Sequence, residues 1–179
     1  MQYNVAQLLQ DDIGTVRLHE LDEPPYMIDP GIEAVAPLTG RVRLMRTNRG
    51  VLADVDLTTQ LHLECSRCLE DVSVPMHTRF TEEFYPTVDL RTGLAVKAPE
   101  GGTGFMLTEA HELDLTEPVR QQVLLDLPMQ PLCRADCAGL CPSCGHNLNQ
   151  GPCECAREPA DARLGTLAQW LKANEVNSR

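Results

Sequence analysis

The chain has 179 residues, of which 42% are hydrophobic but only 4% aromatic, so its core must be built mainly from Val, Leu and Ala. The formal net charge is −11, from 15 basic and 26 acidic side chains, a balance that disfavours broad binding to nucleic acid and favours basic protein partners. The start of the chain lacks the pattern of a signal peptide, and no apolar run approaches the roughly 18 residues of a membrane span. We therefore expect a cytoplasmic protein whose thiols are reduced.

The N-terminal segment predicts a short helix and then a strand. Residues 4–12 have helical spacing of apolar positions, with Asn4 as the expected N-cap and Gly14 as the stop. Residues 15–21 alternate between apolar and polar side chains and predict a strand. The prolines at 24–25 end it.

The next stretch predicts an antiparallel β-meander. Residues 51–63 place apolar side chains at odd positions and mostly polar ones between them, which is typical of a strand buried on one face. Shorter runs of the same period, 41–44 and 72–80, lie on either side of it. Turn residues at 48–50 and 65–68 separate the three strands.

Residues 86–104 are rich in Gly, Pro and Thr and predict a long loop. Its glycine-rich end, 101–104, lacks the Gly-Lys-Ser/Thr ending of a phosphate-binding loop. The following His111-Glu112 begins like a metalloprotease motif, but Leu115 stands where the second histidine would be. Neither motif therefore predicts a catalytic site.

Two further helices are predicted in the C-terminal half. The first follows Thr116, its expected N-cap, has Pro118 in its first turn and ends at Pro128. Its apolar stripe includes Val119 and Val123. The second is predicted over Asp161–Lys172, with Trp170 expected to pack in a core.

Cysteine spacing is the strongest chemical signal in the chain. Two of the eight cysteines form a C-x-x-C pair in LECSRCLE, and the other six are concentrated between positions 133 and 155. Closely spaced thiolates are soft ligands that suit tetrahedral zinc, and reduced thiols make disulfides the weaker interpretation. The candidate metal ligands are Cys65, Cys68, Cys133, Cys137, Cys141, Cys144, Cys153 and Cys155.

The spacing leaves two partitions of these ligands open, and therefore one zinc ion or two. In one partition, two ions are bound by Cys65, Cys68, Cys133 and Cys137 and by Cys141, Cys144, Cys153 and Cys155. In the other, a single distal ion is bound by Cys137, Cys141, Cys144 and Cys155. The first partition closes a loop of about 65 residues, which costs roughly 4 kcal/mol of chain entropy. The binding free energy of a structural zinc site, on the order of 10–16 kcal/mol, would offset this cost.

One group of basic residues is a candidate contact for RNA or another anion. Four arginines occur within nine residues without an acidic residue among them: Arg41, Arg43, Arg46 and Arg49. The plainer interpretation is a solvated strand and turn.

Together these features predict an α+β protein, mainly an antiparallel β-meander with a few short helices and a zinc-ribbon-like, cysteine-rich C-terminal segment. Residues 1–130 would form the β body with its helices. Residues 131–179 would form the zinc-binding segment and C-terminal helix, packed on that body.

Four motifs resemble one known family, the YceD-like large ribosomal RNA subunit accumulation proteins. They are the LECSRCLE strand and turn, the helix from Asp114 to Pro128, the cysteine-rich stretch PLCRADCAGLCPSCGHNLNQGPCEC and the tail that begins Asp161-Ala162-Arg163-Leu164. The resemblance covers roughly residues 51–172. It implies the four-plus-four cysteine sets named above and a role in producing or stabilising large-subunit ribosomal RNA.

We therefore expect a non-enzymatic accessory factor of ribosome assembly with zinc as a structural staple. Its expected partners are a ribosomal protein or an assembly intermediate, with direct contact to rRNA possible, and no membrane or small-molecule substrate. Two complete four-cysteine shells would leave no open metal position for hydrolysis. The alternative is a zinc–thiolate switch that senses oxidants or metal.

Overall fold

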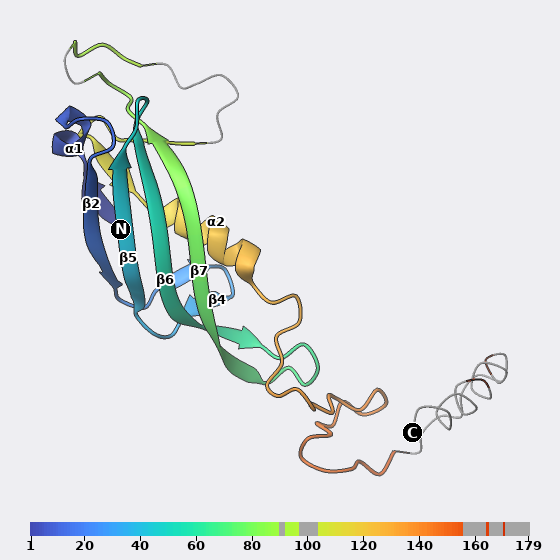
Figure 1. Cartoon of the computed structure of the whole chain (residues 1–179). Helices are drawn as coiled ribbons and strands as arrows, with labels where there is room; N and C mark the ends of the chain where they lie inside the picture. The colour runs from blue at the N-terminus through green and yellow to red at the C-terminus, as the bar shows by residue number, and fades with distance from the viewer. Residues whose placement is uncertain (90–91, 97–103, 156–163, 165–169, 171–179) are drawn as a thin grey trace.

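The computed structural model describes residues 1–89, 92–96, 104–155, 164 and 170. Its body is a bent, mostly antiparallel sheet with one long strand at the centre (Figure 1). The central strand β6 pairs with β7 along its whole length on one side; on the other side it pairs first with β5 and then with β4. The strands of this sheet are β2 (Val16–Glu23), β3 (Met27–Asp29), β4 (Ile32–Ala34), β5 (Leu38–Arg46), β6 (Val51–Glu64), β7 (Asp71–Tyr85) and β8 (Phe105–Met106).

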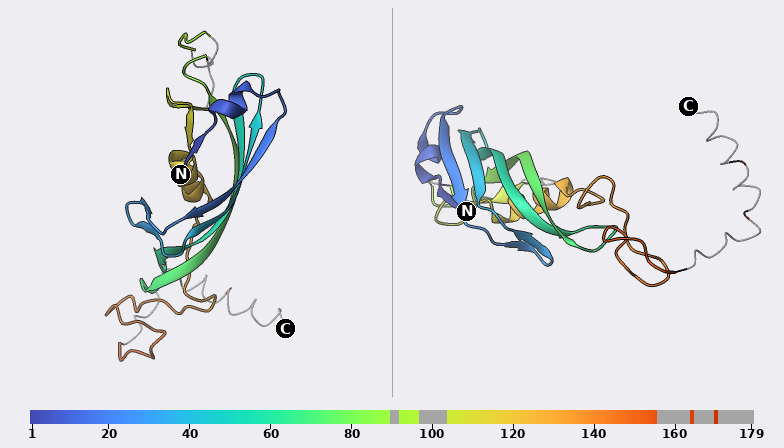
Figure 2. Two further views of the ribbon diagram at one scale, coloured as in Figure 1. Left: turned by 90° about the vertical axis from the view of Figure 1, so that its left-hand side faces the viewer. Right: turned by 90° about the horizontal axis from the view of Figure 1, so that it is seen from below.

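The prediction of a meander is confirmed for β5, β6 and β7, because their hydrophobic period of two matches the pleat. Val51, Val55 and Leu57 are fully buried, and the polar residues between them face the other side of the sheet. The buried side chains line the inner side of the bend, where α2 (Thr116–Asp126) and the N-terminal residues lie (Figure 2). Val119 and Val123 of α2 are fully buried in this core.

Both helices have an N-cap one residue away from the predicted position: α1 begins one residue later than expected and α2 one residue earlier. Strand β1 (Gln2–Asn4) pairs with β9 (Glu112–Asp114), and this ladder holds the residues before each helix in extended conformation. Helix α1 (Ala6–Gln10) therefore has Val5 rather than Asn4 at its N-cap, although the Asn4 side chain still accepts a hydrogen bond from the Ala6 N–H at 3.2 Å.

Thr116 was likewise expected as the N-cap of α2 but is its first helical residue, with Leu115 at the cap. The Asp114 carboxylate, at the end of β9, accepts the Thr116 N–H at 2.8 Å and replaces the expected hydroxyl. Pro118 lies in the first turn as expected, where its missing N–H has no helical partner to lose.

The described part of residues 86–104 contains one isolated bridge, between Val88 and Ala95, and otherwise follows the predicted loop. The predicted helix over Asp161–Lys172 lies outside the described residues except for Leu164 and Trp170. Trp170 is 62% exposed, so the prediction that it packs in a core is wrong. Among the described residues, no helix is long and apolar enough to cross a membrane.

Residues 131–155 leave the end of α2 and run past the turn between β6 and β7, at the far end of the sheet (Figure 1). The Ser66 N–H in that turn donates to the Pro131 carbonyl at 2.8 Å. The guanidinium of Arg67 donates to the Cys137 carbonyl at 2.9 Å. The division at residue 130 into a body and a C-terminal segment stays a prediction.

Candidate metal centres

The eight cysteine sulfurs gather into two sets of four. We call Cys65, Cys68, Cys133 and Cys137 the inner group and Cys141, Cys144, Cys153 and Cys155 the outer group. Within each group all sulfur atoms lie within 4.8 Å of one another. This is the four-plus-four arrangement of the first partition, and each group could hold one metal ion.

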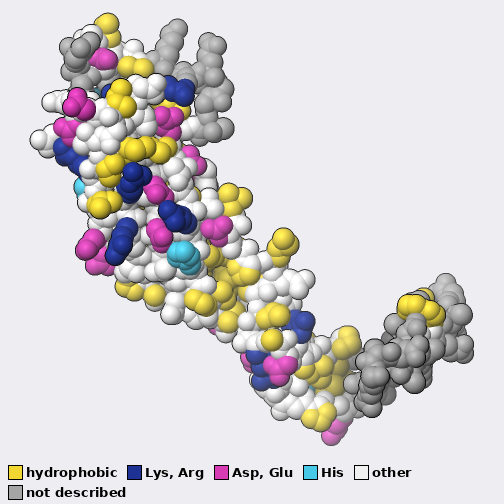
Figure 3. All heavy atoms as spheres, in the orientation of Figure 1, with side chains coloured by type: hydrophobic (Ala, Val, Ile, Leu, Met, Phe, Trp, Pro, Cys, Tyr) yellow, Lys and Arg dark blue, Asp and Glu magenta, His cyan; other side chains and the backbone are white. Residues whose placement is uncertain are grey.

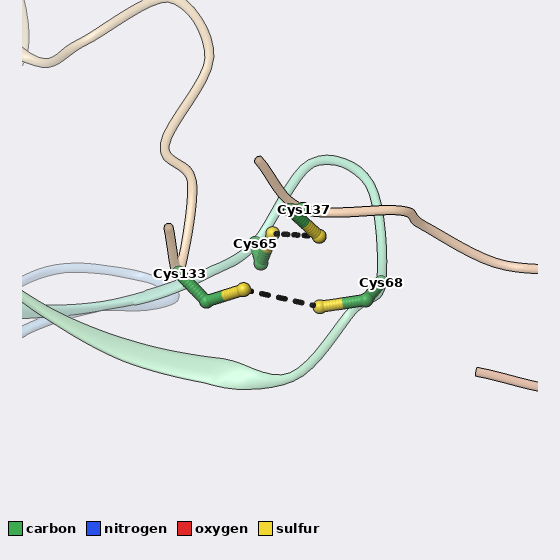
Figure 4. Close-up of side chains that lie close together, drawn as sticks. All are labelled: Cys65, Cys68, Cys133 and Cys137. Carbon is green, nitrogen blue, oxygen red and sulfur yellow. Dashed lines mark hydrogen bonds between the residues drawn. The ribbon is translucent and has the colours of Figure 1, made fainter. Parts of the chain in front are cut away.

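The spacing of the sulfurs in the inner group fits a tetrahedral metal site (Figure 4). Cys65 and Cys137 have their Sγ atoms 3.9 Å apart, and Cys68 and Cys133 have theirs 3.6 Å apart. A zinc–sulfur distance of about 2.3 Å gives a tetrahedron whose edge is about 3.8 Å. A disulfide would need about 2.05 Å, so these thiols are spaced for a shared ion rather than for oxidation to a bond.

The inner group joins two parts of the chain that are far apart in sequence. Cys65 and Cys68 lie in the turn that connects β6 to β7, and the other two cysteines follow α2. Two backbone hydrogen bonds shape the turn: the Leu69 N–H donates to the Cys65 carbonyl at 2.9 Å, and the Cys65 N–H donates to the Glu70 carbonyl at 2.8 Å. Leu69 takes the left-handed conformation, with φ of 58°.

The loop that carries Cys141 and Cys144 of the outer group has the same backbone hydrogen bonds as the turn that carries Cys65 and Cys68. The Gly145 N–H donates to the Cys141 carbonyl at 2.9 Å, and the Cys141 N–H donates to the His146 carbonyl at 2.8 Å. Gly145 has φ of 72°, so it occupies the position that Leu69 occupies in the inner group. A β-bridge between Leu140 and Asn147 closes the loop of the outer group. The last pair of the β6–β7 ladder, Glu64 and Asp71, closes the loop of the inner group in the same way.

Backbone N–H groups select the same cysteine of each loop as the thiolate. The N–H groups of Cys68 and Arg67 lower the pKa of Cys65 to about 6. Those of Cys144 and Ser143 lower the pKa of Cys141 to about 6. Hydrogen bonds to the charged form stabilise it, so each loop presents one ionised sulfur at neutral pH.

Two of the other thiols, Cys133 and Cys155, resist ionisation because they lie buried among neighbouring sulfurs. Burial raises the pKa of Cys133 to about 12. The hydrogen bond with the Cys144 side chain, reinforced by burial, raises the pKa of Cys155 to about 12. A bound divalent cation removes this penalty, because a coordinating thiol is deprotonated outright.

Sequence reasoning missed the polar residues that surround the inner group. The Asn149 amide donates to the sulfur of Cys137 at 3.3 Å and lowers the pKa of that thiol, while its oxygen accepts the Ala138 N–H at 2.8 Å. The Asn147 amide donates to the Glu70 carboxylate at 2.8 Å. These contacts connect the residues after the outer loop to Cys137 of the inner group and to the β6–β7 turn. The only signal in the sequence is Asn-Leu-Asn close to a cysteine loop, which does not specify a partner.

The four arginines considered as an RNA or anion contact do not form a purely positive patch. Arg41 lies opposite Asp56, and Arg43 lies opposite Asp54, across the β5–β6 ladder. On the face shown in Figure 3, basic and acidic side chains alternate.

Arg46 turns back to the backbone, where its guanidinium donates to the Gly50 carbonyl at 2.9 Å in the β5–β6 turn. Arg49 lies exposed in the same turn. The four arginines therefore do not converge on one site, and the RNA or anion contact stays a prediction with less support than its spacing suggested.

The fold and the site define a class of protein: a mainly antiparallel β body joined by its longest hairpin to two four-cysteine groups. The family described as large ribosomal RNA subunit accumulation protein YceD matches residues 53–171, and the chain belongs to this family.

Known relatives come from bacteria and a plant. The chain is 32% identical over 177 residues to an uncharacterized protein of Mycobacterium tuberculosis, covering 96% of this chain and 81% of the relative. It is 26% identical over 164 residues to the uncharacterized protein YlbN of Bacillus subtilis, covering 90% and 87%. It is 26% identical over 163 residues to the chloroplastic large ribosomal RNA subunit accumulation protein YCED homolog 1 of Arabidopsis thaliana, covering 78% and 51%. No solved structure matches the chain significantly.

Proposed function

We propose that this protein is a non-enzymatic accessory factor in the accumulation or processing of large-subunit ribosomal RNA and in ribosome assembly, acting in the cytoplasm. The observation that carries the proposal is membership of the YceD family, whose description names large ribosomal RNA subunit accumulation. The plant relative carries the same words in its name.

The metal of the proposal is zinc, in a structural role and in a zinc-ribbon-like segment. The inner and outer groups would each hold one ion through four sulfurs, which completes a tetrahedral shell. The support is the pair of sulfur distances, 3.6 and 3.9 Å, and the repeated loop that aims backbone N–H groups at the first cysteine. Bound zinc would supply charge neutralisation and cross-linking of the chain.

The absence of catalysis in this proposal follows from the donor set. Four cysteine ligands on each ion leave no open position for a water or substrate. Two cavities among the described residues of the sheet, each of about 430–440 Å³, are lined mainly by strand side chains at its surface and lie outside both groups. We therefore include no small-molecule substrate and no membrane partner in the proposed role.

Charge favours protein over RNA as the first partner. The net charge of −11 attracts basic ribosomal proteins and repels phosphate backbones. Arg41 and Arg43, two of the four arginines considered as an RNA contact, lie opposite aspartates on β6. A ribosomal protein or an assembly intermediate that contains one is the proposed partner, with any direct rRNA contact secondary.

Depletion of the protein in its own host tests this function. The expected result is a lower ratio of large-subunit to small-subunit rRNA and fewer mature large subunits in sucrose gradients. Wild-type protein should restore both, whereas a Cys133→Ser variant should not, because it opens the inner group. Unchanged rRNA ratios and subunit profiles after full depletion would refute the proposal.

A zinc–thiolate switch is the second candidate, and the exposure of Cys144 in the outer group favours it. Oxidation of an accessible thiolate would release its ion and unfold the loop. Mild peroxide should then release one zinc equivalent, seen with a chromogenic chelator, and change the affinity for the partner. Zinc release without any change in partner binding would exclude a switch.

A further inference from the structure

Strand β2 forms an open edge of the main sheet. It pairs with β5 from Val16 opposite Met45 to Glu23 opposite Leu38. Within the described residues no other strand pairs with β2. Eight residues of backbone therefore run along the edge of the sheet with one side available (Figure 1).

The hydrogen-bond pattern identifies the residues whose backbone faces outward. The Arg46 N–H donates to the Thr15 carbonyl at 2.9 Å, in the same register as the β2–β5 ladder. Antiparallel ladders alternate between bonded and non-bonded pairs, so the odd residues of β2 bond to β5. The even residues direct their N–H and C=O groups away from the sheet; they are Val16, Leu18, Glu20 and Asp22.

The side chains of these four residues divide into an apolar and an acidic half. Val16 and Leu18 are 39% and 73% exposed, and the nearby Ile13 is 70% exposed. Glu20 and Asp22 are also exposed. Hydrophobic side chains and charged side chains lie side by side on the face shown in Figure 3. The edge thus offers apolar contacts at one end and negative charge at the other.

The opposite edge of the sheet, strand β7, is protected against pairing. The Cys65 N–H bonds to the Glu70 carbonyl in the register of the β6–β7 ladder, so the odd residues of β7 face outward. Pro75 is one of them and has no N–H to offer, and β8 covers the end of the strand. Natural sheets guard their edges with such residues. Strand β2 has no proline and no lysine.

We propose that the open edge of β2 binds an extended basic segment of a protein partner by β-strand addition. The segment would carry Lys or Arg opposite Glu20 and Asp22, and apolar residues opposite Val16 and Leu18. Main-chain hydrogen bonds supply affinity in this mode and alternate side chains supply specificity. This inference rests on the proposed function, because it assigns the contact with a basic ribosomal protein to one strand.

The same chemistry disfavours the two other occupants. A second copy paired antiparallel over the full edge would place Leu18 opposite Glu20 and Val16 opposite Asp22, which matches apolar with acidic side chains. RNA would meet the carboxylates of Glu20 and Asp22. A basic polypeptide strand is the occupant that complements both halves.

A synthetic peptide tests the proposal with the full-length, zinc-loaded protein. The probe Lys-Thr-Arg-Thr-Val-Thr-Val pairs antiparallel with residues 22 to 16, and its matched control has Glu and Asp in place of Lys and Arg. We expect the basic peptide to bind at least tenfold more tightly than the control. Amide hydrogen exchange should slow at Leu18, Glu20 and Asp22 and stay unchanged in β7.

Two variants locate the contact. Leu18→Pro removes an outward N–H and spares the bonds to β5, so peptide affinity should fall at least tenfold, whereas Leu18→Val should bind normally. If Leu18→Pro does not fold, the double variant Glu20→Lys/Asp22→Lys decides, because it should reverse the preference to the acidic peptide. Binding that ignores these changes, protection at another site, self-association through β2, or protection of β2 by RNA alone would each overturn the proposal.

The outcome is separable from that of the depletion experiment. Loss of large-subunit rRNA on depletion together with normal rescue by Glu20→Lys/Asp22→Lys would refute the docking site and leave the proposed function standing. Normal rRNA on depletion would refute the function itself.

Discussion

Leu69 closes the inner cysteine loop in the left-handed conformation, with φ of 58°. The left-handed region costs a non-glycine residue about 1–2 kcal/mol. The equivalent position in the outer loop is Gly145. Both loops therefore need a left-handed residue directly after the second cysteine. Only the sequence Cys-Pro-Ser-Cys-Gly indicates this in advance, because glycine favours that conformation.

Replacing Leu69 by glycine should therefore stabilise the protein. The gain is at most about 1.5 kcal/mol, because the freer unfolded chain of glycine offsets about 0.5–1 kcal/mol of the relief. Leu69 is 61% exposed, so little burial is lost. Thermal denaturation with zinc present measures the change. The matched control, Gly145→Leu, should lower the midpoint, and a rise in both or neither would contradict the shared loop geometry.

The Asn149 amide donates a hydrogen bond to the sulfur of Cys137 and would lie outside the coordination shell of an ion bound there. Partners of this kind orient the ligand, and their loss typically costs 10–100-fold in metal affinity. Asn149→Leu should therefore weaken zinc binding at the inner group by about that factor, measured by competition with a chelator of known affinity. Asn4→Leu, which alters a side chain remote from both groups, should leave zinc affinity unchanged. Equal affinities for Asn149→Leu and wild type would show that the hydrogen bond at 3.3 Å has no role in holding the ion.

At the scale of elements, α2 is fixed to the sheet by an ion-pair network as well as by its apolar stripe. Arg120 donates to Glu117 one turn earlier and to Asp29 at the end of β3, both at 2.8 Å. The hydrogen bonds from Arg120 and then Gln121 lower the pKa of Glu117 to about 2. The Arg120–Asp29 pair joins helix to sheet, and the Glu117–Arg120 pair, which lies within α2, is the part of the network whose charge is lost at low pH.

The sign of this pH dependence follows from linkage. A carboxyl whose pKa is lower in the folded state stabilises the fold above its ordinary pKa of 4.5, and loses that contribution as pH falls toward about 2. In Glu117→Gln, stability should fall less steeply than in wild type between pH 4.5 and 2. Chemical denaturation of both proteins across this range measures the difference in their free energies of unfolding. Protonation of the zinc ligands affects both proteins equally and therefore cancels in this difference. Parallel curves would mean that the network does not form in solution.

Much of the central sheet could be predicted from the sequence, because the side chains of β6 are mostly apolar on one face and mostly polar on the other along its 14 residues. The short strands β1 and β9 could not, because three residues carry no period and pair only through tertiary contact. That pairing also moved both helix caps, at Asn4 and Thr116, by overriding local preference. The spacing of the cysteines predicted metal ligands but left two partitions open, and the grouping into two sets of four depended on the fold. The contacts of Asn147 and Asn149 depended on how the two loops meet.

At the scale of the whole molecule, the two cysteine groups differ in what they join. The inner group links the β6–β7 turn to the segment after α2, and the outer group joins only residues 141–155 to each other. The residues after the outer loop in turn contact Glu70 in the β6–β7 turn through Asn147, and Cys137 of the inner group through Asn149. We expect the inner group to support the outer one more than the reverse.

Single serine variants test this order. Cys153→Ser should lose the outer ion and keep the inner one, and the midpoint of thermal unfolding of the β body should stay close to that of wild type. Cys133→Ser should weaken both sites, because the outer loop loses its support. Zinc titration of each variant gives the count, and equal loss from the two variants would contradict the hierarchy.

Zinc content per chain tests the central claim most directly. Native mass spectrometry of protein purified under reducing conditions should give two zinc ions per chain, with removal by a chelator accompanied by loss of structure in residues 131–155. A reduced, fully folded protein that contains no metal would contradict the account.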